Sequence, residues 1–254
     1  MSRLVRGARG LVLPVLLLVA WELVTRFHLA NAHLLVPPSK VLASLRETWR
    51  DGELGPDIAG SLVRDLAGFA LGAVAGLVVG GVLGLSRWAD RAFGPTLNGA
   101  KQVAVFAWLP LISVWFGTEE RAKILFVALA AFYPIVANTH EGIRSVERQH
   151  VQVANVFVFS RLQTFRKVVL PAALPSIFAG LHLGLIYAWL GTLGAEFLLA
   201  AAPGVGNLMI DGREQFAMDK VLLGVIVAAL VGFGTNAVAT LAERRALHWR
   251  VRGL

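Results

Sequence analysis

The chain has 254 residues, of which 56% are hydrophobic and 16% are charged, with a formal net charge of +8. This composition, with a mean hydropathy of +0.66, excludes an ordinary soluble domain and predicts that most residues lie in a membrane or a bundle core. The absence of cysteine excludes disulfides and thiolate metal sites. Because no phosphate-binding loop, zincin helix or Ser-His-Asp pattern is present, we expect neither an enzyme nor a bound cofactor.

Six apolar segments are long enough to cross a bilayer, which requires about 20 residues per helix. They cover residues 11–27, 62–85, 97–116, 124–138, 173–199 and 221–241. We therefore predict an all-α, polytopic membrane helix bundle of about six transmembrane helices, forming a single domain over residues 1–254. The lipid bilayer is its first predicted partner.

Basic residues are concentrated in alternate connections between these segments. If both termini share one side with the connections 86–101 and 139–172, that side holds 15 of the 24 Lys and Arg residues and four acids. The other side holds nine basic and ten acidic residues. By the positive-inside rule, both termini are predicted to be cytoplasmic. The basic charge therefore indicates topology, and we expect no nucleic-acid partner.

The N-terminal segment has two interpretations. An arginine-rich start, an apolar run and Ala-Asn-Ala at 30–32 are typical of a cleaved signal peptide. Against this, Glu22 and Arg26 interrupt the apolar run, and cleavage would leave an odd number of spans. We expect the first helix to remain uncleaved.

The connection 28–61 is too polar to cross the membrane and is predicted to be external. A Pro-Pro-Ser sequence at 37–39 is a helix-start signal, and apolar residues then recur at helical spacing as far as Trp49. This pattern predicts a short amphipathic helix on the membrane surface, anchored by Trp49. A scaffold role is favoured, with contact to an external partner as the alternative.

Glycine recurs at every fourth position of the second apolar segment, at Gly68, Gly72, Gly76, Gly80 and Gly84. On a helix these positions form one ridge without side chains, which lets a neighbouring backbone approach closely. Because a glycine costs a helix about 1 kcal/mol relative to alanine, five in register indicate packing. We expect the packing partner within the same chain, and a second copy is the alternative.

Two different faces are predicted for the fifth apolar segment. At 100° per residue, His182, Trp189 and Glu196 lie on one face, opposite a face of small residues. His182 is expected about 15 Å deep, with Glu196 near the outer end. Ionisable groups at such depth usually line a cavity or a bundle interior. One interpretation is a translocation path lined by His182 and Trp189, with Glu196 at an outer gate. The other is structural, with His182 bonded to a backbone carbonyl and Glu196 paired with a basic residue of another helix.

The connection 139–172 is basic but also carries a run of apolar residues around Phe157. Such residues would be a liability on a free surface and would suit a groove on another protein. Burial in the headgroup region of the membrane is the alternative.

This connection resembles the coupling loop of permeases from bacterial ATP-driven importers, which reads E-A-A, three residues, G, nine residues, I-x-L-P. Aligned on the Leu-Pro ending, the corresponding residues are Gln152, Val153, Ala154, Val158, Leu170 and Pro171. The ending and Ala154 match the pattern, whereas Gln152 replaces the glutamate and Val158 replaces the glycine.

The resemblance is to the branch serving alkanesulfonate, taurine and nitrate/bicarbonate uptake, and it extends over nearly the whole chain. Short matching motifs lie at 36–41, 115–117, 122–124, 143–146, 195–196 and 204–208. The paired prolines usual early in the third span are replaced by Ala104 and Val105, so we expect that helix to be straighter here.

The resemblance implies a type I ABC importer (MetI-like) permease fold in the bacterial inner membrane. It implies a second copy of the chain in the pore, two cytoplasmic ABC ATPase subunits and an extracytoplasmic solute-binding protein. The implied ATPase-coupling residues are Gln152, Val153, Ala154, Phe157, Val158, Arg161, Leu170 and Pro171. The expected cargo is a small organic anion such as an aliphatic sulfonate or taurine. Nitrate, bicarbonate or a vitamin precursor is the alternative cargo, and a stand-alone secondary transporter or channel is the alternative from a different class.

Overall fold

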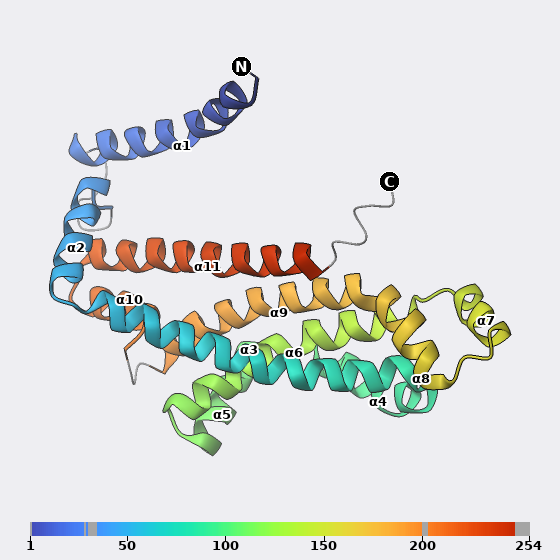
Figure 1. Ribbon diagram of the computed structural model, residues 1–254. Coiled ribbons are helices and arrows are strands. Elements are labelled where there is room, and N and C mark those ends of the chain that lie inside the picture. The colour runs from blue at the N-terminus through green and yellow to red at the C-terminus, as the bar shows by residue number, and fades with distance from the viewer. Residues whose placement is uncertain (1, 28, 30–34, 200–202, 247–254) are drawn as a thin grey trace.

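The computed structural model describes residues 2–27, 29, 35–199 and 203–246, and side chains from residue 12 onward except at 148 and 151. The described residues are almost entirely helical and contain no strand (Figure 1). The long helices are α1 (Ser2–Arg26), α3 (Leu54–Leu85), α6 (Glu120–Arg144), α9 (Leu170–Leu198) and α11 (Met218–Ala246). The short ones are α2 (Pro38–Arg50), α4 (Arg87–Ala100), η1 (Val105–Trp108), α5 (Leu109–Phe116), α7 (Arg148–Val156), α8 (Arg161–Thr164), η2 (Phe165–Val169) and α10 (Val205–Glu214).

Four helical segments among the described residues are long and apolar enough to span a membrane: α3, α6, the continuous 38-residue stretch that ends with α9, and α11. A bent pair, α4 with η1 and α5, makes a fifth if it is counted as one span. The predicted first span falls in α1, where the side chains of residues 2–11 lie outside the described part. The all-α membrane class is confirmed.

The predicted third span is not one straight helix. The chain leaves α4 after Ala100 and enters η1 at Val105 with a bend of 91°. Pro110 acts after this bend: its ring removes a backbone donor and clashes with the Phe106 carbonyl, which separates η1 from α5. Pro110 is instead tolerated in the first turn of α5, where no donor is required. The third span is therefore broken, and a straighter course than in the permeases it resembles stays a prediction.

Within the predicted external connection 28–61, α3 already begins at Leu54, so the last part of this connection is helical. Pro56 and Asp57 lie in the first turn of α3, where a missing donor is harmless and an acid favours the helix dipole. The amphipathic helix predicted within this connection is confirmed as α2, with Trp49 68% exposed.

The glycine ridge of α3 packs on α6 of the same chain, as expected. An added Cβ at Gly68 would lie 2.5 Å from Val127, and one at Gly76 would lie 2.8 Å from Ile135. Glycines of α9 also meet α6, at Ala130, Ile135 and Asn138, so α6 packs closely against both α3 and α9. Figure 1 shows α11 beside α9, and α1 apart from the bundle.

Candidate coupling surface and translocation path

The coupling loop projects from the end of the bundle where α6 ends and α9 begins (Figure 1). Five exposed apolar side chains lie along α7, the following turn and α8: Val153, Val156, Phe157, Val158 and Leu162. We call these five residues the loop patch. Among the other predicted coupling residues, Gln152, Arg161 and Pro171 are exposed and Leu170 is half-buried. Ala154 is 2% exposed and packs inside the loop, so it cannot contact a partner directly.

Val158 has a left-handed backbone, with φ of 56°. Its N–H donates to the Asn155 carbonyl at 3.0 Å, and the Phe159 N–H donates to the Ala154 carbonyl at 3.1 Å. These two bonds form a Schellman motif at the end of α7, which usually has glycine at this position. A β-branched valine is strained in this conformation. The glycine in the coupling-loop pattern therefore has a structural reason, and Val158 occupies the same backbone position without its freedom.

The segment after Val158 is also tightly held. Ser160 and Gln163 form a capping box at the start of α8, each side chain bonding the other's backbone N–H. The Lys167 ammonium lies 5.1 Å from the centre of the Phe159 ring, within cation–π range. The loop patch is therefore presented on an ordered turn.

His182 and Trp189 both face α11. His182 Nε2 lies 2.5 Å from Asn236 Oδ1, and its Nδ1 lies 3.6 Å from a carboxylate oxygen of Glu243. Trp189 Nε1 donates to the Ala228 carbonyl at 3.1 Å. Trp189 and Asn236 line a cavity of about 370 Å³ between α9 and α11. These two predicted path residues thus lie along one interface.

Glu196 is fully buried at the opposite end of α9, within an ion-pair network. Arg64 of α3 bonds Glu196 through Nη1 at 2.5 Å. The same guanidinium bonds Glu120, at the start of α6, through Nε at 2.6 Å and Nη2 at 2.8 Å. Arg64 Nη2 also donates to the Pro203 carbonyl at 2.7 Å. One arginine thus ties three helices to the connection before α10.

The network also holds the start of α10. Ser61 Oγ lies 2.8 Å from Glu196 Oε1 and accepts from the Val205 N–H at 2.9 Å. The Gly206 N–H donates to Glu196 Oε2 at 2.9 Å. A Cβ added at Gly204 would lie 2.6 Å from Glu196 Cδ, so a side chain there would push the backbone off the carboxylate. Glu196 is therefore saturated with donors, which offsets the cost of burying its charge.

Comparison with known proteins identifies the chain. Residues 68–248 match the family described as binding-protein-dependent transport system inner membrane component. The chain belongs to this family of permeases. It is 38% identical over 242 residues to the aliphatic sulfonates transport permease protein SsuC of Bacillus subtilis (strain 168), covering 95% of this chain and 87% of that protein. It is 34% identical over 242 residues to the taurine transport system permease protein TauC of Escherichia coli (strain K12), covering 93% and 87%.

The fold of this permease is that of the type I importers. A solved structure of the MetNI methionine ABC transporter, in an inward-facing conformation, matches it with a TM-score of 0.58. The match covers 73% of the permease and 94% of the MetNI chain at 19% identity, so it shows the fold alone. Family membership makes the permease a membrane component of an ATP-driven importer, together with a binding protein and an ATPase, and not an enzyme itself. It also decides against a stand-alone carrier or channel.

The predicted residues form two separate groups in the permease. The predicted coupling residues gather at one end of the bundle, and Glu196 lies at the other, with His182 and Trp189 between them on α9. Sequence reasoning missed Ser61 and Arg64 as partners of Glu196, and Glu120 as the second carboxylate bonded by Arg64. An arginine eleven positions into a glycine-rich apolar helix was the available signal, because a buried charge there requires a partner.

Proposed function

We propose that the permease carries a small organic anion, an aliphatic sulfonate or taurine, across the bacterial inner membrane. The observation that carries this proposal is a sequence identity of 34–38%, over nearly the whole chain, to proteins named for sulfonate and taurine transport. Bicarbonate is the second candidate, since a bicarbonate transport permease CmpB of Synechococcus elongatus is 34% identical over 58% of the chain.

In this proposal two copies of the permease form the pore, both termini are cytoplasmic, and two ATPase subunits bind the coupling loops. The loop patch supports docking, because five exposed apolar side chains on an ordered turn suit a groove on a partner. Closure of the ATPase pair would then rock the bundle around a central site.

The proposed path follows α9. Trp189 borders the cavity of about 370 Å³ against α11, which is large enough for a small solute, and His182 contacts Asn236, which also lines it. His182 provides donors for an anion when its contact with Asn236 or Glu243 opens. Glu196 contributes to the outer gate as part of the Arg64 network rather than as a ligand of the solute.

The test is complementation of a strain that lacks its own sulfonate and taurine permeases. The permease is expressed with the ATPase and the binding protein encoded beside it, and uptake of radiolabelled taurine, ethanesulfonate and bicarbonate is measured. Uptake of either sulfonate, lost when the ATPase is omitted, supports the proposal. Uptake of bicarbonate without either sulfonate contradicts the cargo and retains the permease assignment.

A further inference from the structure

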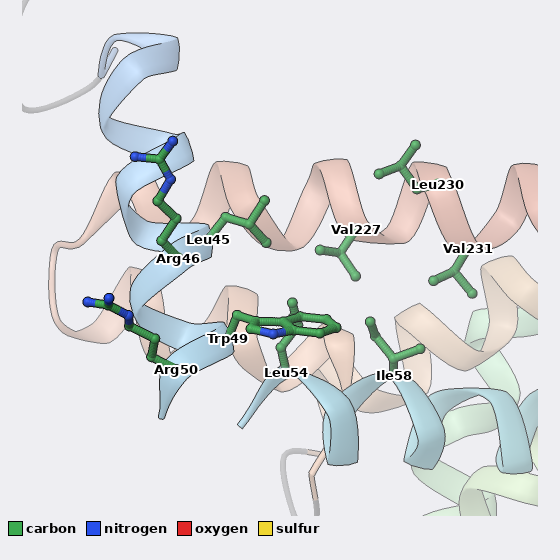
Figure 2. Close-up of a pocket in the computed structure, with 9 residues that line it drawn as sticks. All are labelled: Leu45, Arg46, Trp49, Arg50, Leu54, Ile58, Val227, Leu230 and Val231. Atoms are coloured by element: carbon green, nitrogen blue, oxygen red, sulfur yellow. The ribbon is translucent and has the colours of Figure 1, made fainter. Parts of the chain in front are cut away.

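A second hollow lies away from the proposed path, where α2 crosses the ends of α3 and α11. This groove has a volume of about 760 Å³, and Figure 2 shows the apolar side chains that line it. They include Leu45 and Trp49 from α2, Leu54 and Ile58 from α3, and Val227 and Val231 from α11. Leu54 and Val227 are buried, whereas Trp49 is 68% exposed. The groove therefore has an apolar floor and an open mouth.

Two arginines border this groove. Arg46 and Arg50 lie one helical turn apart on α2, and the aliphatic parts of their side chains contribute to the lining. In Figure 2 both guanidinium groups lie on the α2 side of the groove and extend away from Ile58 and Val231. Within the described part of the chain, neither guanidinium makes a hydrogen bond or an ion pair, although Glu47 lies on the same helix.

This arrangement of an apolar groove beside two cations is complementary to an anionic amphiphile. The apolar side chains of the groove suit hydrocarbon, and the two arginines can donate to phosphate oxygens in the fork geometry that guanidinium favours. Trp49 lies between the two regions, and indole rings are enriched at the depth where lipid headgroups meet acyl chains. Arginines of a surface helix that reach away from the bundle would meet the headgroup layer.

We propose that this groove is a binding site for one anionic phospholipid per chain. An acyl chain lies in the groove between α2, Ile58 and α11, and the phosphate binds Arg46 and Arg50. The bound lipid joins α2 to the ends of α3 and α11. This site shares no lining residue with the cavity beside Trp189, so it stands independently of which solute is carried.

Native mass spectrometry of the intact permease in mild detergent tests the site. Phosphatidylglycerol and phosphatidylcholine with the same acyl chains are titrated separately. We expect one phosphatidylglycerol to bind about tenfold more tightly than phosphatidylcholine. Both lipids carry a phosphate, but only in phosphatidylcholine does a choline cation already balance its negative charge. The double variant Arg46→Gln/Arg50→Gln should bind both lipids equally.

A matched control is provided by Arg87 and Arg91 of α4. They have the same spacing, are exposed and flank the exposed Trp88, but they do not line this groove. The variant Arg87→Gln/Arg91→Gln should keep the wild-type preference. Val231→Trp fills the groove and leaves both α2 arginines, so it should weaken the binding of both lipids.

Three results would overturn the proposal. Equal binding of the two lipids by the wild type removes the headgroup assignment, as does a preference that survives in Arg46→Gln/Arg50→Gln. The third result concerns what occupies the groove. The proposal predicts that a photoreactive residue at position 230, at the groove mouth, forms an adduct with phospholipid in membranes. An adduct with a second copy of the chain at that position would show that the groove is a protein interface.

Discussion

At the scale of single residues, two side chains depart from what their positions favour. Val158 has a left-handed backbone at the end of α7, and Arg64 is a charged residue 4% exposed inside a membrane-spanning helix. Their environments differ. Arg64 is satisfied by two carboxylates and a carbonyl, whereas no contact removes the backbone strain of Val158. Replacing Val158 by glycine is therefore expected to stabilise the protein, and replacing Arg64 by an uncharged residue is expected to destabilise it.

Val158→Gly should stabilise the coupling loop by about 1 kcal/mol, since an L-residue with left-handed backbone costs about 1–2 kcal/mol and glycine loses part of that gain through entropy. Hydrogen exchange of the 152–163 amides should slow. Val156→Gly is the control, because it lies in the last turn of α7 and should accelerate the same exchange. Equal effects of the two substitutions would contradict the Schellman assignment.

Arg64→Met should lower the stability of the permease by about 3 kcal/mol, because it leaves Glu196 buried without its cation. The double variant Arg64→Met/Glu196→Gln should recover part of this loss, since no unpaired charge remains at position 196. Thermal unfolding in detergent measures both. Strictly additive losses would show that the two residues do not act as a pair.

At the scale of elements, α6 is central because its neighbours present glycine to it. Gly72 is the tightest example, since an added Cβ would meet the Ala128 carbonyl and lie 2.9 Å from the Ala131 Cβ. A backbone carbonyl cannot move aside as a flexible side chain does. By contrast, Gly81 of the same helix has open space around it.

Gly72→Ala should therefore destabilise the bundle by about 1–3 kcal/mol through overpacking. Gly81→Ala should be neutral or stabilising, since alanine is the better helix former. Thermal unfolding in the same detergent compares the two. If both substitutions behave alike, the close contact between α3 and α6 is not the reason for the glycine ridge.

At the scale of the whole molecule, the two ends of the bundle differ in kind. The end with α10 is held by the Arg64 network, and the opposite end presents the loop patch. The proposed coupling to an ATPase would require a rigid body with an exposed contact, and this division is consistent with both requirements.

Phe157→Asp should reduce co-purification of the ATPase from native membranes at least about tenfold, by placing a charge in a desolvated contact. The permease itself should remain folded, because Phe157 is 69% exposed. Trp88→Asp is the control, an equally exposed aromatic residue outside the loop patch. Unchanged recovery of the ATPase with Phe157→Asp would remove the docking assignment.

The amino-acid sequence by itself determined the membrane class, four of the spans, the amphipathic α2 and the face of α3 that packs. These depend on hydropathy and periodicity, which are local properties of the chain. It did not reveal the start of α3, because Ser61 and Arg64 are polar yet buried. Only the tertiary structure decided that Glu196 pairs with Arg64, 132 residues away, and that the third span bends by 91°. The physical reason is the same in both cases: whether a polar group or a helix break is tolerated depends on which residues of other helices meet it.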